Sequence, residues 1–182
     1  MLSELRTRKL TRYFNVLDTN HDGFFSADDS ALIVSRLVAF RGLKPGTVEH
    51  DAFIERFGQY WHEVRCNIDA SEDGKVSLAE WLHYHNLMLA NPARFEASAA
   101  TAARLIAGLL DANGDGEVTV AEYAAWLRAW GMVDDAEIDD VNRRIDINGD
   151  GLLSVDEIMS LIRDFFFSDD PDAPGNWAMG PF

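Results

Sequence analysis

The sequence predicts an all-α protein built from four copies of one unit, in which an acidic loop joins two helices. Four twelve-residue segments share one pattern of acidic residues around a central glycine: Asp18–Asp29, Asp69–Glu80, Asp111–Glu122 and Asp146–Glu157. Apolar residues recur every three or four positions on both sides of each segment, as they do along one face of an amphipathic helix. A chain of 182 residues provides for one compact domain or two small ones.

Composition and charge exclude several classes of protein. Hydrophobic residues make up 47% of the chain, enough to build a packed core. The 31 acidic and 16 basic residues give a formal charge of −15, which opposes binding to nucleic acids or anionic membranes. The single cysteine, Cys66, cannot form an internal disulfide. The first residues lack the apolar region of a secretory signal, and no apolar stretch is long enough to span a membrane, so we expect a cytoplasmic protein.

The repeated segments have the oxygen donors that a calcium ion requires. Ca²⁺ is a hard cation that takes six to eight oxygen ligands, and a short loop can supply them from alternate side chains. The first, third and fifth positions of the four loops are Asp18, Asn20 and Asp22; Asp69, Ser71 and Asp73; Asp111, Asn113 and Asp115; and Asp146, Asn148 and Asp150. Glycine at the sixth position permits the sharp bend that this ligand order needs.

The second part of each loop completes the pattern. The seventh position offers only its backbone carbonyl, the eighth is apolar and pairs with a partner loop, the ninth has a hydroxyl, and the twelfth reaches back to the ion with a carboxylate. The residues at positions 7, 9 and 12 are Phe24, Ser26 and Asp29; Lys75, Ser77 and Glu80; Glu117, Thr119 and Glu122; and Leu152, Ser154 and Glu157. This is the pattern of an EF-hand calcium loop, so we expect up to four Ca²⁺ ions.

The charge balance agrees with this interpretation. Each loop has three carboxylates at ligand positions, and without these twelve residues the formal charge of −15 would be −3. Most of the acidity therefore lies where the ions are expected. Zinc is not expected, because His21, His50, His62, His83 and His85 lack the spacing of a zinc site.

The predicted architecture is four EF-hands in two pairs that pack into one compact globule, as in the calmodulin-like superfamily. Residues 1–90 form the first pair, residues 91–167 the second, and residues 168–182 a C-terminal tail. The halves meet near Asn91–Pro92, and Gly42, Pro45 and Gly46 mark a turn between two helices of the first pair. The tail ends with Trp177, Met179 and Phe182, so we expect it to dock between the halves instead of staying in solvent.

These features resemble the sarcoplasmic calcium-binding protein family, and most closely its bacterial, calerythrin-like branch. The resemblance is carried by the uneven loop spacing, by the stretch Glu122–Leu127 with Trp130-Gly131-Met132, and by Ile162–Phe165. It covers nearly the whole chain and is sharpest from Asp111 to Phe167. It implies a compact cytosolic protein that binds calcium tightly, with magnesium competing, and buffers or transports the ion.

The sequence departs from that family at two loops. Calerythrin-like proteins usually have a degenerate second loop, whereas here Asp69, Asp73 and Glu80 are all present. The first loop ends in Asp29 instead of glutamate. A shorter carboxylate reaches an ion with one oxygen more easily than with two, so we expect this loop to be the weakest calcium site or the most tolerant of Mg²⁺.

Three functions are compatible with the loops. A calcium buffer that acts as a monomer with no obligate protein partner is favoured, because the chain has five methionines and no methionine cluster of the sensor type. The alternatives are a calcium sensor that binds a target protein and a coelenterazine-type small-molecule binder. Photoproteins of that type use a histidine in the last helix, and residues 155–167 contain none. No catalytic constellation is present, so we expect no enzymatic activity.

Two residue types have a structural interpretation. Trp126 and Trp130 lie four residues apart, as expected for two core residues on one helix face. Cys66, in the helix before the second loop, is expected to be a small core residue.

Overall fold

The computed structural model describes residues 1–91, 107–111, 113, 115–134 and 136–181. Pro92, in the predicted junction between the halves, and Phe182, in the predicted tail, lie outside this range. Within it, residues 107–110 are helical, and the named elements are α1 (Glu4–Leu17), β1 (Phe24–Phe25), α2 (Ala27–Phe40), α3 (Val48–Ile68), β2 (Val76–Ser77), α4 (Leu78–Met88), α6 (Val120–Trp130), α7 (Ile138–Ile145), α8 (Val155–Phe167) and the 3₁₀ helix η1 (Pro174–Trp177).

The loops associate two by two. β1 and β2 are antiparallel, with Phe25 opposite Val76, and they join the first loop to the second. The third and fourth loops meet in a bridge in which Leu153 N donates to Val118 O at 2.7 Å. These four residues all occupy position 8 of their loops, and all are buried. The predicted pairing is therefore confirmed, and its cause is the burial of one apolar side chain from each loop.

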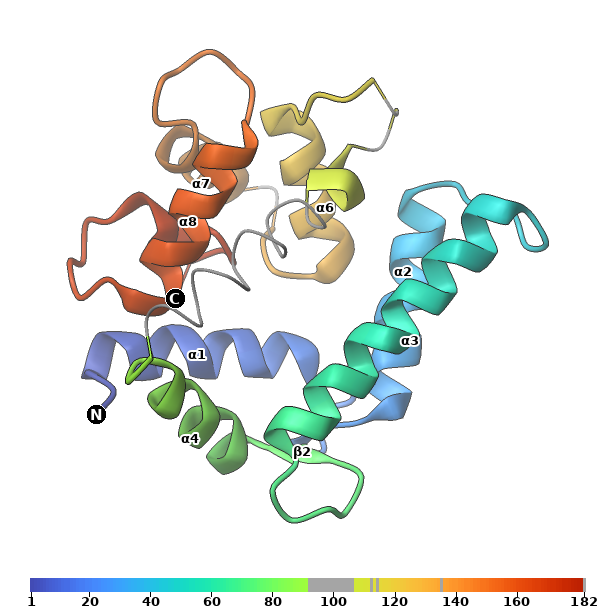
Figure 1. Ribbon diagram of the computed structural model, residues 1–182. Helices are drawn as coiled ribbons and strands as arrows, with labels where there is room; N and C mark the ends of the chain where they lie inside the picture. Colours follow the sequence, from blue (N-terminus) through green and yellow to red (C-terminus); the bar gives the residue numbers. More distant parts are fainter. Residues whose placement is uncertain (92–106, 112, 114, 135, 182) are drawn as a thin grey trace.

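The two pairs share one hydrophobic core, and α1 lies between α4 of the first pair and α8 of the second (Figure 1). The ring of Tyr13 in α1 packs edge-on against Trp81 of α4 and against Phe165 of α8, with centroid separations of 5.5 and 6.0 Å. Trp81 Nε1 also donates to Leu10 O at 3.1 Å. Since α8 belongs to the second pair, these contacts confirm the predicted compact globule.

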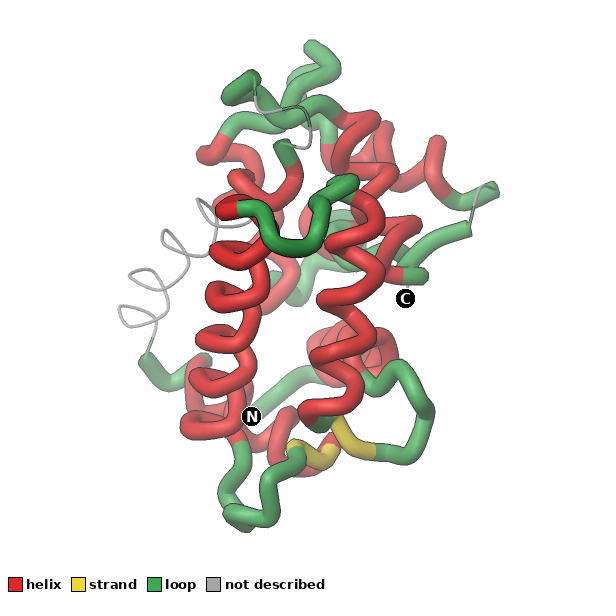
Figure 2. The backbone as a smooth tube through the Cα atoms, turned by 90° about the vertical axis from the view of Figure 1, so that its right-hand side faces the viewer, coloured by secondary structure: helices red, strands yellow, loops and turns green. Residues whose placement is uncertain are grey.

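Helices α2 and α3 form a hairpin at one side of the molecule, and α2 also packs against α6 (Figures 1 and 2). The turn between them contains Gly42 and Gly46, with φ of 61° and 81°, which are values that favour glycine. Arg41, at the end of α2, donates through Nη1 to the carbonyls of Gly108 and Leu109 at 3.0 and 2.9 Å. The hairpin is thereby linked to the helical turn that precedes the third loop.

Cations from α1 donate to main-chain carbonyls of the second half, most of them at the end of α8. Arg6, Lys9 and Arg12, which we call the cationic clasp, lie three residues apart in sequence and all donate to carbonyls of the second half. Lys9 is fully buried, and its Nζ donates to Asp164 O at 3.0 Å and to Ser168 O at 3.1 Å. The last carbonyls of a helix lack partners within the helix, so a cation there is favourable.

The C-terminal tail lies against α7 and α8. Asn176 is fully buried and accepts a hydrogen bond from Lys9 Nζ at 2.7 Å. Tyr123 Oη donates to Ala178 O at 2.6 Å, and Met179 is part of the core. A side chain at Gly175 would approach Leu161 O to 2.3 Å, so the tail can come this close only with glycine at that position.

The two tryptophans of α6 and the cysteine of α3 differ in burial. Trp126 and Trp130 are buried, as predicted. The prediction for Cys66 is wrong, because this residue is exposed. The buried face of α3 contains Val64 and Ile68, and a residue midway between them points to the opposite side of the helix. None of the helices in the described part of the chain is both long and apolar enough to cross a membrane.

Lys9→Met should destabilise the protein by about 2–4 kcal/mol, because it leaves two carbonyls and the Asn176 amide oxygen buried without their donor. Unfolding in urea, monitored by circular dichroism, measures the loss. Lys44→Met is the matched control, since Lys44 is exposed and its loss should change stability by less than about 0.5 kcal/mol. Equal stability of the two variants would contradict the role of the clasp.

Candidate metal sites

The first ligand position of every loop is fixed by the loop's own glycine. The position-6 N–H donates to the position-1 aspartate at N···O distances of 2.9, 2.9, 3.0 and 3.1 Å in loops one to four. These glycines have φ between 80° and 89°, so the predicted sharp bend is present. The bend turns the chain back so that its amides face the position-1 carboxylate.

Positions 3 and 5 turn their oxygens in the same way. In the first loop Asn20 Oδ1 accepts from Asp22 N at 2.8 Å, and Asp22 Oδ1 accepts from Phe24 N at 3.0 Å. The third and fourth loops repeat both bonds. In the second loop Ser71 Oγ instead donates to Asp69 Oδ1 at 3.3 Å. The side-chain oxygens of each loop are therefore held by short local hydrogen bonds.

The side chains at position 7 have different surroundings in the four loops. The Lys75 ammonium lies 5.0 Å from the centroid of the Phe24 ring, so the position-7 residues of the first pair pack on each other. Glu117 is exposed, and Leu152 forms the bridge with Thr119. This agrees with a position that offers only its carbonyl, because the four side chains have no common task.

Positions 9 and 12 also start the helix that leaves each loop. The position-9 hydroxyl and the position-12 carboxylate form a reciprocal capping box in every loop: Ser26 with Asp29, Ser77 with Glu80, Thr119 with Glu122, and Ser154 with Glu157. The twelfth residue is thus both a candidate ligand and a structural cap, and the loop and its helix cannot change independently.

The position-12 carboxylates of the first pair are stabilised in the charged form. Hydrogen bonds from the backbone and hydroxyl of Ser77 and from Ser71 outweigh desolvation and lower the pKa of Glu80 to about 2. Burial alone would raise the pKa of Asp29, but hydrogen bonds from Ser26, Thr19 and Asn20 lower it below its usual value. Both groups are therefore ionised at neutral pH, as a calcium ligand must be.

The donor set of each loop fits a hard divalent ion. In the part of the chain that the structure describes, no three histidine, cysteine or carboxylate side chains converge as a ready-made metal cluster. An EF-hand loop does not require one, because it draws its other oxygens from amide, hydroxyl and main-chain groups. His85 is packed against Trp81 and Phe166, and desolvation lowers its pKa to about 4, so it is a neutral packing residue.

Comparison with known proteins identifies the repeated unit. The EF-hand family matches residues 108–127 and 139–162, which contain the third and fourth loops. These two segments of the chain are similar to EF-hands. The chain is similar to calerythrin of Saccharopolyspora erythraea, with 25% identity over 174 residues that cover 92% of this chain and 95% of calerythrin. The predicted resemblance to the sarcoplasmic calcium-binding proteins, with calerythrin among the relatives, is confirmed.

Solved structures share the fold of this chain. The sarcoplasmic calcium-binding protein from amphioxus superposes with a TM-score of 0.74 at 19% identity, over 100% of both chains. The coelenterazine-binding protein from Renilla muelleri gives a TM-score of 0.75 at 22% identity, also over 100% of both chains. At these identities the likeness concerns the fold alone.

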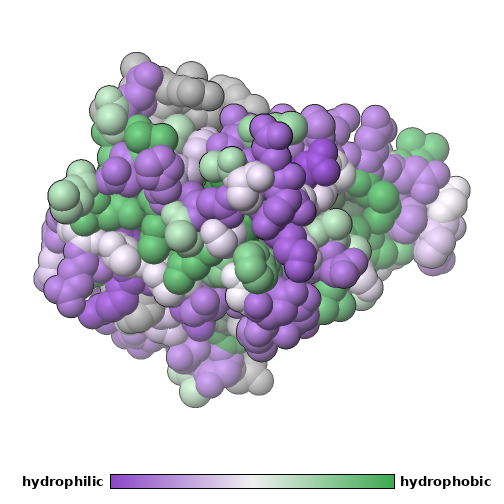
Figure 3. Space-filling view, turned by 90° about the horizontal axis from the view of Figure 1, so that it is seen from below, coloured by the Kyte–Doolittle hydropathy of each residue, from purple (hydrophilic) through white to green (hydrophobic). Residues whose placement is uncertain are grey.

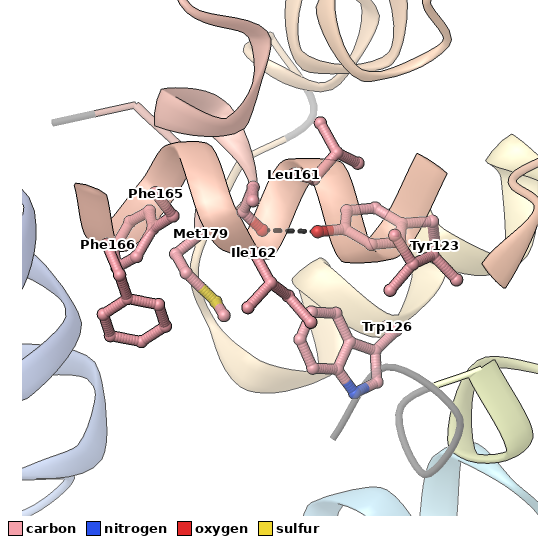
Figure 4. Close-up of a pocket in the computed structure, with 9 residues that line it drawn as sticks. Tyr123, Trp126, Leu161, Ile162, Phe165, Phe166 and Met179 are labelled. Carbon is pink, nitrogen blue, oxygen red and sulfur yellow. Dashed lines mark hydrogen bonds between the residues drawn. The ribbon is translucent and has the colours of Figure 1, made fainter. Parts of the chain in front are cut away.

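The described residues line an apolar hollow and a more polar one. An apolar cavity of about 20 Å³ lies between α6, α8 and the tail, next to Tyr123, Trp126 and Met179 (Figure 4). A larger hollow of about 470 Å³ lies beside the third and fourth loops and is lined by Asn148, Asp150 and Glu157 among others. The first is about the size of one water molecule, and the second is lined by candidate metal ligands.

The backbone conformation at position 4 of the loops was not predicted from the sequence. Position 4 of the loop also has a left-handed backbone, with φ of 59° at His21, 60° at Glu72 and 74° at Gly149. Only the fourth loop, among these three, has a glycine there. The available signal was this glycine, which the first two loops replace with residues that adopt the same conformation at some energetic cost.

Gly116→Ala should destabilise the third loop by about 1–2 kcal/mol, because φ is 89° and the added methyl group meets nothing within 4 Å, so the cost is backbone strain alone. Gly58→Ala is the matched control: it lies inside α3 with similar open space and should stabilise the protein by about 0.5–1 kcal/mol. Urea unfolding of both variants measures these opposite signs. A stabilising effect of Gly116→Ala would show that the bend does not require glycine.

Proposed function

We propose that this protein binds calcium ions at its four acidic loops and acts as a cytoplasmic calcium buffer. The observation that supports this most directly is common to all four loops: the position-6 amide holds the position-1 aspartate, and a carboxylate at position 12 caps the next helix. A bound ion would neutralise the three carboxylates of each loop. The ion would be held by the side chains at positions 1, 3, 5, 9 and 12 and by the backbone carbonyl at position 7.

Buffering is favoured over sensing because apolar surface is largely enclosed. Sensors expose a methionine-rich groove to their targets, whereas Met132 is fully buried and Met179 nearly so. The face shown in Figure 3 carries hydrophobic residues in small groups between polar ones. The cationic clasp and the shared core also join the two halves. We therefore propose that calcium fills the loops without opening the globule.

Coelenterazine-type binding receives less support from the cavities. Sites for molecules of that size enclose about 300–1,000 Å³ and are mostly apolar. The apolar cavity beside Tyr123 has about 20 Å³. The larger hollow reaches this volume, but its lining includes Asn148, Asp150 and Glu157, which are candidate ligands for an ion in the fourth loop.

Glu122→Gln should lower the number of bound calcium ions by one, because the neutral amide offers a single oxygen and cannot replace a bidentate carboxylate. Glu117→Gln is the matched control in the same loop, since only the main chain of this exposed residue is a candidate ligand. Equilibrium dialysis, with and without magnesium, gives the count for both variants and for the wild type. Equal counts for the two variants would contradict the ligand assignment, and a wild-type count of zero would refute calcium binding.

Removing calcium with a chelator tests the buffer against the sensor. We expect less than a twofold change in the fluorescence of an apolar dye between calcium-loaded and metal-free protein, because the core stays closed. A several-fold rise with calcium would favour a sensor, and calcium-dependent capture of a target protein would then identify its partner.

A further inference from the structure

The first loop has a hydrogen-bonding side chain at position 2, where the other loops have apolar residues. Thr19 occupies this position, where the other three loops have Ala70, Ala112 and Ile147. Both Thr19 N and Thr19 Oγ1 donate to Asp29 Oδ1, each at 2.9 Å, and Asn20 N adds a third bond at 3.2 Å. One oxygen of the position-12 carboxylate thus has three donors.

The second oxygen of Asp29 is also occupied. Asp29 Oδ2 accepts from Ser26 N at 2.9 Å and from Ser26 Oγ at 2.7 Å. A carboxylate offers about four lone-pair directions, so five donors saturate it. In the second loop, by contrast, Ala70 has no polar side-chain atom that could add to the bonds from Ser71 and Ser77 to Glu80.

Burial separates the first loop from the others as well. Asp29 and Asp18, at the two ends of the ligand set, are 1% and 5% exposed, whereas the corresponding residues of the other loops are half-buried. Water cannot easily replace a protein donor to a buried carboxylate, so displacing these hydrogen bonds is costly. Aspartate is also one methylene shorter than glutamate and has less freedom to turn toward an ion while retaining its donors.

We propose that Thr19 determines the metal affinity of the first loop, by holding Asp29 in a hydrogen-bonded arrangement that persists without a metal and that calcium must displace. This inference rests on the proposed calcium function of the loops and names the residue that makes one of them different. Thr19 acts through Asp29, so it is a positioning residue. The threonine hydroxyl competes with the ion for the same carboxylate oxygen.

Thr19→Val tests the proposal, because valine keeps the volume and shape of threonine but removes the hydroxyl donor. Each position-6 glycine N–H donates to its position-1 aspartate, so the amide signals of Gly23, Gly74, Gly116 and Gly151 report on the four loops separately in ¹H–¹⁵N NMR spectra. In a calcium titration of the full chain we expect the Gly23 midpoint to fall about tenfold, the effect of one hydrogen bond to a charged group. The other three midpoints should not change.

A second measurement requires no metal. The unfolding temperature of the metal-free variant should fall by about 2–4 °C, because the hydrogen bond from Thr19 Oγ1 to Asp29 stabilises the metal-free loop. Thr19→Ser is the matched control: it keeps the hydroxyl and should match the wild type in both measurements. A Gly23 midpoint that is unchanged or higher in Thr19→Val, or an unchanged metal-free unfolding temperature, would overturn the proposal.

The two proposals can fail separately. If no glycine signal responds to calcium in any variant, the proposed calcium function is wrong. The metal-free unfolding temperature then still shows whether the hydrogen bond from Thr19 to Asp29 stabilises the loop. If Gly74, Gly116 and Gly151 respond normally while Gly23 is indifferent to the substitution, calcium binding stands and the role of Thr19 is refuted.

Discussion

The pairing of adjacent loops is the constraint on which the rest of this structure depends. Phe25 and Val76 in one pair, and Val118 and Leu153 in the other, are buried only because the loops meet back to back. Residue 9 of each loop caps the next helix, and residue 12 completes the capping box. A loop that moved would therefore carry its helix with it, so ligand geometry and helix packing form one cooperative unit.

Joining the two pairs requires a different kind of interaction. Apolar contacts such as Tyr13 with Phe165 bring α1 and α8 together, but they do not by themselves select one relative position. The clasp adds direction, because the buried Lys9 ammonium is favourable only where carbonyl oxygens meet it. Arg41 makes an equivalent bond from α2 to the turn before the third loop. Cations of the first half thus satisfy helix-end carbonyls of the second.

The sequence predicts what is local and leaves out what is distant. Positions 6, 8 and 12 of the loops follow from the requirements of an ion and a paired loop, so the fold and the candidate ligands could be read from a repeat of twelve residues. The clasp could not, because most of its acceptors are main-chain carbonyls, which have no sequence signature, and they lie more than 100 residues away. The prediction for Cys66 was wrong because it relied on residue type: a free cysteine is often buried, but the helix face on which it lies determines its exposure.

Within the loops, carboxylates that repel one another must be held together, and either amide donors or a cation can do this. Donors from its own loop stabilise the charged form of the Glu80 carboxylate and lower its pKa to about 2. A loop that supplies more donors needs an ion less, because each hydrogen bond already offsets part of the repulsion that the ion would cancel. The number of donors around position 12 is therefore a physical measure of how much an EF-hand loop gains from its metal. By this measure the loops of one chain differ even when they match the same sequence pattern.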